Sequence, residues 1–120
     1  MGEVRLINLE IANSIYQELT KKEYRYDQEF TRLRDKLFKD AITYTNVRAE
    51  WHLKDKKEKL ESDSYRKTVH DILIYSCDNL AMYMVNNNMD ATWWKRVGEK
   101  REVIGDFACY LHLIMALSAR

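Results

Sequence analysis

The sequence predicts an all-α fold, an antiparallel bundle of four main helices with the last helix central or at a dimer interface. Proline is absent from the 120 residues and only three glycines occur, so residues that interrupt helices are almost missing. Apolar residues make up 46% and charged residues 32%, a balance typical of globular rather than disordered chains. Residues 1–120 are therefore expected to form a single helical domain with its own core.

Two helices are expected in the first half of the chain. Asn8 can cap a first helix that runs to about Lys22, and the polar segment 21–26 is the expected connection. Asp27 can cap a long second helix. That helix carries apolar residues at spacings of three and four: Phe30, Leu33, Leu37, Ala41, Tyr44, Val47 and Trp51.

A third helix is expected after the charged run 54–61, which is predicted to be a solvated helix end or a loop. Ser62 or Asp63 is its expected start, and residues 86–88, all Asn, are its expected stop, because Asn tolerates the left-handed conformation. The apolar face predicted for this helix consists of Tyr65, Val69, Ile72, Leu73, Ser76, Leu80, Tyr83 and Met84.

The C-terminal part is expected to hold a short helical turn, capped by Asp90 or Thr92, and a long last helix from about Glu99 after a break at Gly98. Between residues 107 and 117 the only polar side chain is His112. A helix that is apolar on nearly every face has to be surrounded, so we expect it at the bundle centre or in a homodimer interface. Its fully apolar core is shorter than the ~20 residues that cross a bilayer.

Charge and cysteine usage predict a cytoplasmic protein. Lys and Arg (20) nearly balance Asp and Glu (19), so no bulk charge attracts the chain to nucleic acid or to acidic membranes. Cys77 and Cys109 lie in apolar helical stretches without CxxC spacing, which favours reduced, buried thiols. The N-terminal residues show no secretion-signal pattern.

Carboxylates on the last helix form a candidate magnesium site. Glu99, Glu102 and Asp106 share one face at spacings of i, i+3 and i+7, and hard cations prefer several oxygen ligands. The string 102–111 resembles the second acidic motif of the MazG-type all-α nucleotide pyrophosphohydrolases, which implies Glu102 and Asp106 as metal ligands. The first motif of that family has no convincing match, and Asp71 is among the nearest substitutes. An acidic first turn favoured by the helix dipole explains the same residues without a metal.

Other catalytic sets are incomplete. His52, His70, Asp71 and Asp106 follow the ligand order of the HD-type metal phosphohydrolases, but a histidine beside an apolar face is more often packed and hydrogen-bonded. No motif for nucleophilic catalysis or for dinucleotide binding is present. We therefore expect no cofactor, with magnesium as the alternative.

Trp93 and Trp94 are candidate partner-binding residues. Adjacent side chains on a helix point about 100° apart, so a core does not readily hold both, and an exposed Trp is a typical anchor for a protein partner. Equally, one can cap the bundle end while the other packs along it. The basic clusters at 32–39 and 95–101 are interleaved with acids, which favours a solvated face over a nucleic-acid site.

Two segments carry a wider resemblance. Residues 26–37 and 104–111 resemble parts of an uncharacterised family of small helical proteins encoded by phages and mobile elements of Gram-positive bacteria. That resemblance implies a bacterial, cytoplasmic origin and no catalytic residue. It also implies that 104–111 is a packing signature, in which Gly105 permits close helix approach and Asp106 pairs with Arg48 or His70.

The sequence leaves three functions open and favours the first. The first is a non-enzymatic helical protein that binds another protein, as a regulator or an inhibitor. The second is a magnesium-dependent nucleotide phosphohydrolase, and the third is a nucleic-acid-binding accessory protein. The helical fold cannot separate them, because one fold hosts many functions.

Overall fold

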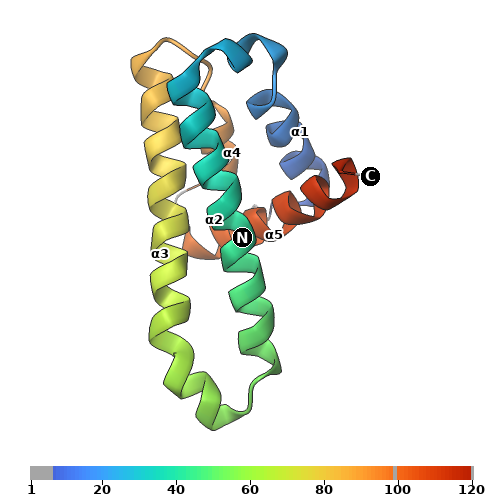
Figure 1. The fold of residues 1–120 in the computed structure, drawn as a ribbon, viewed down its shortest axis with the longest axis vertical. Helices are drawn as coiled ribbons and strands as arrows, with labels where there is room; N and C mark the ends of the chain where they lie inside the picture. Colours follow the sequence, from blue (N-terminus) through green and yellow to red (C-terminus); the bar gives the residue numbers. More distant parts are fainter. Residues whose placement is uncertain (1–6, 99, 120) are drawn as a thin grey trace, which may run out of the picture.

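The computed structural model describes residues 7–98 and 100–119, and within these ranges the chain is all-α, without strands (Figure 1). The elements in chain order are α1 (Leu9–Leu19), the 3₁₀ helix η1 (Lys22–Tyr26), α2 (Gln28–Leu53), α3 (Lys56–Asn86), α4 (Trp93–Val97) and α5 (Arg101–Ser118). The predicted class and the four main helices are confirmed. In these described ranges no helix combines the length and the hydropathy needed to cross a membrane.

Side-chain caps begin three of the helices. Asn8, Asp27 and Asp55 each accept a hydrogen bond from the backbone N–H three residues along, over 2.8–2.9 Å. The predicted caps Asn8 and Asp27 are therefore confirmed. Asn88 (φ 58°), just beyond α3, and Gly98 (φ 79°), just beyond α4, have positive φ angles and mark the predicted stops.

The expected start of the third helix at Ser62 or Asp63 is wrong, because most of the charged run 54–61 is helical. α3 begins at Lys56. Asp55 supplies its cap, and Lys and Glu propagate a helix well without an apolar face. As a result α2 and α3 form one long antiparallel hairpin, whose lower end projects beyond the other helices (Figure 1).

The N-terminal half of α5 lies at the centre of the fold, as predicted for the last helix. α5 crosses the α2–α3 hairpin and contacts α1, α2, α3 and α4 (Figure 1). Its inner side chains are fully buried together with those of the hairpin and of α4: Ile104, Phe107, Ala108, Leu111, Phe30, Leu37, Leu73, Leu80 and Trp93. Leu113 and Leu117 are about half exposed, so the final turns of α5 are not surrounded.

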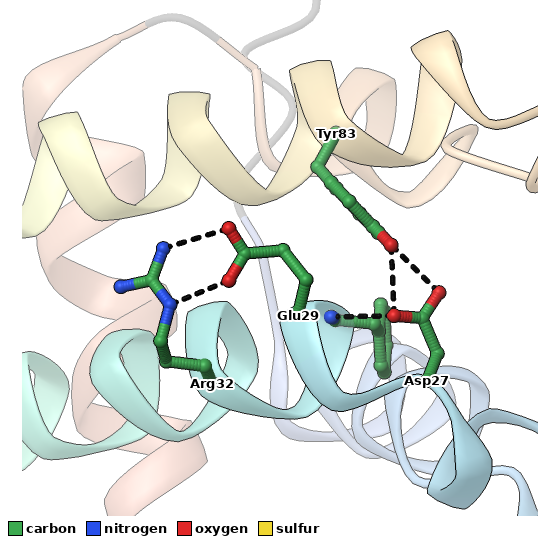
Figure 2. Close-up of polar contacts among 5 residues, drawn as sticks. Asp27, Glu29, Arg32 and Tyr83 are labelled. Carbon is green, nitrogen blue, oxygen red and sulfur yellow. Dashed lines mark hydrogen bonds and ion pairs between the residues drawn. The ribbon is translucent and has the colours of Figure 1, made fainter.

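Polar contacts fasten α2 to α3 near the upper end of the hairpin. Tyr83 of α3 donates to both carboxylate oxygens of Asp27, over 2.7 and 2.8 Å, while Asp27 also caps α2 (Figure 2). The hydrogen bonds from the Phe30 N–H and from Tyr83 lower the pKa of Asp27. Beside them, within α2, Arg32 donates two parallel hydrogen bonds to the carboxylate of Glu29 (Figure 2).

Gly105 lets α5 approach α2 closely, as the resemblance of segment 104–111 implies. A Cβ atom at position 105 would lie 2.7 Å from the Tyr44 hydroxyl oxygen and 3.2 Å from its Cζ atom. The Tyr44 side chain is buried and its ring centroid lies 4.7 Å from that of His70, so the ring has little room to move. The absence of a side chain at position 105 therefore sets the spacing of the two helices.

Gly105→Ala is expected to destabilise the protein by about 1–3 kcal/mol, because the added methyl group overpacks the contact with Tyr44. In a helix without this contact, Gly→Ala would instead stabilise by up to about 1 kcal/mol. The measurement is urea unfolding. Tyr44→Phe in the Gly105→Ala background removes the closest clashing atom and should recover part of the loss. A stabilised Gly105→Ala variant would contradict the close approach.

Candidate functional site

A polar cleft opens where the α2–α3 hairpin passes the N-terminal half of α5. It holds a cavity of about 370 Å³, and its lining comes from α2 (Tyr44, Arg48, Trp51, His52), α3 (Arg66, His70) and α5 (Glu102, Asp106). A neighbouring hollow of about 360 Å³ shares three of these residues and adds Lys67 and Arg101. We call the two hollows together the polar cleft. Spacings of three and four residues along each helix turn these side chains toward one side.

Asp106 is held by Arg48, one of the two partners predicted for it. Arg48 Nη1 lies 3.1 Å from Asp106 Oδ1 and 3.6 Å from Cys109 Sγ, and both charged side chains are partly exposed. Burial acts to lower the pKa of Arg48, but the neighbouring Tyr44, Asp106 and Cys109 outweigh it and raise that pKa. The guanidinium therefore stays charged beside the carboxylate.

His70 is a packed and hydrogen-bonded histidine, as the sequence favoured. Its Nε2 atom lies 2.8 Å from the carbonyl oxygen of Arg101, and Nε2 must donate because a carbonyl oxygen only accepts. Burial is the main cause that lowers the pKa of His70, and the positive charges of Arg101 and Arg66 act in the same direction. The ring is therefore neutral near pH 7.

Arg66 of α3 stacks on the ring of Trp51 of α2. Its guanidinium carbon lies 4.5 Å from the centroid of the indole ring, and Lys59 Nζ also lies over that ring, at 4.9 Å. Arg66 Nη2 pairs with Asp63 at 2.9 Å. Its Nε atom is buried and has no hydrogen-bond partner within the described residues. An unpaired buried donor of this kind costs about 1–3 kcal/mol.

The structure does not gather the carboxylates proposed as a magnesium site. Within residues 7–98 and 100–119, no three His, Cys, Asp or Glu side chains lie close enough together to hold a metal ion. Asp71 pairs with Arg101 at 2.7 Å and Asp106 pairs with Arg48. Glu102 lines the polar cleft, and Glu99 lies outside the described residues. Of the set with HD-type ligand order, His52, His70 and Asp106 line the polar cleft, but no three described members of the set lie close enough together to hold a metal ion.

The two tryptophans have different environments. Trp93 is fully buried, its Nε1 donates to Met84 Sδ over 3.2 Å, and its ring lies near Phe107. Trp93 is therefore not a surface anchor, which corrects that part of the partner-binding prediction. Trp94 is half-buried and lines a hollow of about 290 Å³ together with Asp78, Ala81, Met82, Val85 and Asn86.

Large apolar side chains are exposed along the outer face of α3. We call this set the outer stripe, and it consists of Tyr65 (59% exposed), Ile72 (42%), Tyr75 (67%), Met82 (63%) and Val85 (63%). Tyr65 and Ile72 were expected on the buried face, and that expectation is wrong. With Thr68, Asn79 and Asn86, most of the stripe follows the alternating spacing of three and four that is typical of a helix-packing seam. This second periodicity was available in the sequence and was missed, because α3 carries apolar residues on two faces.

A further apolar hollow lies between α1 and the end of α5. It measures about 500 Å³ and is lined mainly by Leu9, Asn13, Ile114 and Leu117. Leu9 and Leu117 are about half exposed. This is the part of α5 that other helices leave uncovered.

Comparison of the chain with protein-family models, with curated proteins and with solved structures gives no match. The resemblances stated for segments 26–37, 102–111 and 104–111 therefore stay predictions as far as family membership is concerned.

Folding stability is expected to depend on the protonation of His70. Its pKa in the folded state is lowered from 6.5, so the unfolded chain takes up the proton first as the pH falls. The contribution of His70 is complete above pH 6.5 and is lost as the pH falls through the lower, folded-state pKa. The free energy of unfolding, measured with urea at pH 7.5, 6.5 and 5.5, should fall less with decreasing pH in His70→Gln than in the wild type. An unchanged decline would contradict this account.

Asp106→Asn is expected to melt slightly earlier than the wild type, with a loss of up to about 1 kcal/mol, because it breaks a partly exposed ion pair. Magnesium and manganese should not raise the melting temperature of either protein, since the carboxylates are held by arginines. Thermal-shift measurements with each metal, with and without nucleoside triphosphates, check both points. A metal-dependent rise that disappears in Asp106→Asn would restore the magnesium site.

Proposed function

We propose that this protein acts by binding another protein through the outer face of α3. The observation that carries the proposal is the outer stripe, which ends beside the half-buried Trp94. Its five side chains expose on the order of 500 Å², at the upper end of the range for apolar patches on monomers. The largest apolar patch on a monomer is often a functional site.

The shape of the surface favours a helix as the partner element. An apolar face with alternating spacing of three and four accepts a second helix that carries the same spacing. The stripe from Tyr65 to Val85 spans 20 residues, or about 30 Å of helix. At its end, the hollow beside Trp94 offers a place for one large apolar side chain of the partner. Tryptophan in such a position is typical of residues that dominate binding energy.

Charge favours a different protein over a second copy of this chain. Asp71 and Asp78 flank the outer stripe, and Asp78 forms no ion pair within the described residues. A two-fold antiparallel pairing centred between Ile74 and Tyr75 would set Asp71 of one copy opposite Asp78 of the other, and like charges in such positions repel. We therefore propose an amphipathic partner helix with Lys or Arg along its facing flank.

Charge substitutions in the outer stripe provide the test. A photo-crosslinking amino acid at position 75, in cells that express the protein, identifies the partner, and the same amino acid at Tyr26 is the control. Binding of the purified partner is then measured by calorimetry. Tyr75→Glu and Met82→Glu should each raise Kd at least about tenfold, because they place a charge in an apolar interface. Both positions are largely exposed, so folding is retained.

Tyr26→Glu is the matched control, because Tyr26 is 76% exposed but lies on η1 and is not part of the outer stripe. It should leave the affinity unchanged. Light scattering at tens of micromolar should give the mass of a monomer for the wild type. Two results would overturn the proposal: a partner that binds Tyr75→Glu as tightly as the wild type, or a wild-type dimer that Tyr75→Glu dissociates.

A further inference from the structure

Cations outnumber carboxylates among the residues that line the polar cleft. The described residues that line it include four cations, Arg48, Arg66, Lys67 and Arg101, and two carboxylates, Glu102 and Asp106. His70 is buried and hydrogen-bonded through Nε2, so it accounts for none of this charge near pH 7. We propose that the polar cleft binds the phosphate group of a small hydroxylated phosphate ester, of the size of a sugar phosphate.

The cations approach the cleft from three helices. Arg48 comes from α2, Arg66 and Lys67 from α3, and Arg101 from α5. A tetrahedral phosphate accepts hydrogen bonds from several directions, and guanidinium groups are well suited to donate them. A phosphate ester carries a charge of about −1.5 to −2 at pH 7, so it can interact with more than one of these cations.

The ion pairs of these cations leave donors for a ligand. Asp63 pairs with both Arg66 and Lys67, and Asp71 pairs with Arg101, but neither carboxylate lines either hollow. Each pair engages one terminal nitrogen of its guanidinium, and a guanidinium has five N–H donors. The remaining donors of both arginines are therefore free to turn toward an anion in the cleft.

Arg66 gives a second, independent indication of a ligand. Its Nε donor is buried and has no partner within the described residues, and buried donors without partners are uncommon in folded proteins. The indole ring of Trp51, 4.5 Å away, holds the guanidinium in place. An acceptor oxygen in the cleft reaches this donor only after the side chain shifts, because the Nε atom is buried.

The lining also indicates which chemical group is attached to the phosphate of the ligand. Trp51 is already covered by Arg66 and Lys59, and the Tyr44 ring packs against His70, so neither ring offers an open face to a nucleobase. Glu102 and His52 add polar groups that hydrogen-bond hydroxyls. Cavities of about 370 and 360 Å³ accommodate a small metabolite. The cleft therefore fits a phosphorylated sugar better than a nucleotide.

Calorimetry with ribose 5-phosphate, inorganic phosphate and ribose at constant ionic strength tests the proposal. Ribose 5-phosphate should bind, inorganic phosphate should bind more weakly, and ribose should not bind. In NMR spectra the ring signals of His70 and the indole signal of Trp51 should shift on binding. Those of His112 should stay, because His112 does not line either hollow.

Arg66→Gln should raise the Kd for ribose 5-phosphate at least about tenfold, because it removes a charged donor. Arg101→Gln, at a half-exposed position, should weaken binding in the same direction if Arg66→Gln fails to fold. The matched control is Arg32→Gln, which removes the same charge from the far end of α2. No binding by the wild type, or equal loss in Arg32→Gln, would overturn the proposal. Tight binding of a single-stranded oligonucleotide without binding of ribose 5-phosphate would also overturn it.

Discussion

The close contact of α5 with α2 at Gly105 and Tyr44 determines how the rest of the molecule is arranged. Because position 105 has no side chain, the Tyr44 ring can lie directly against α5. This spacing brings the next residue, Asp106, within reach of Arg48 on the following turn of α2. It also brings the backbone carbonyl of Arg101 within reach of His70. The polar cleft is therefore a consequence of the helix crossing, since its lining comes from the three helices that meet there.

The hairpin of α2 and α3 is stabilised from within, and this leaves the outer face of α3 uncovered. Tyr83 and Ser76 of α3 donate to Asp27 and Asp40 of α2, so polar groups reinforce the apolar contacts between the two helices. The buried face of α3 packs against α2 and α5. The apolar side chains that remain outside are consequently not required by the core of a single chain. A binding partner is the simplest physical reason for their presence.

The cleft and the outer stripe differ in what each can recognise. The cleft is small, concave and rich in cations, which suits a small anion. The outer stripe is long, convex and apolar, which suits a protein surface. Asp71 and Arg101 join the two, because their ion pair connects the flank of the stripe to the lining of the cleft.

The sequence by itself determined the helical class and most helix ends, because these depend on local chemistry. The absence of proline and the caps Asn8 and Asp27 act within a few residues, so they can be recognised without a structure. The Gly105 packing and the Arg48 partner of Asp106 came from a resemblance, and the structure bears them out. In contrast, the start of α3 was misjudged, because its first turns need no apolar residues.

Only the tertiary structure decided which apolar face of α3 is buried and which of the two tryptophans is covered. Both faces of α3 carry suitable spacing, and the choice between them follows from where α2 and α5 pack. Trp93 fills space beside Phe107, and Trp94 is then directed toward the surface by the helical rotation of about 100°. Likewise, the carboxylates of Asp71 and Asp106 pair with Arg101 and Arg48, which lie on helices distant in the sequence. Such partners depend on helix crossings, which local sequence patterns do not specify.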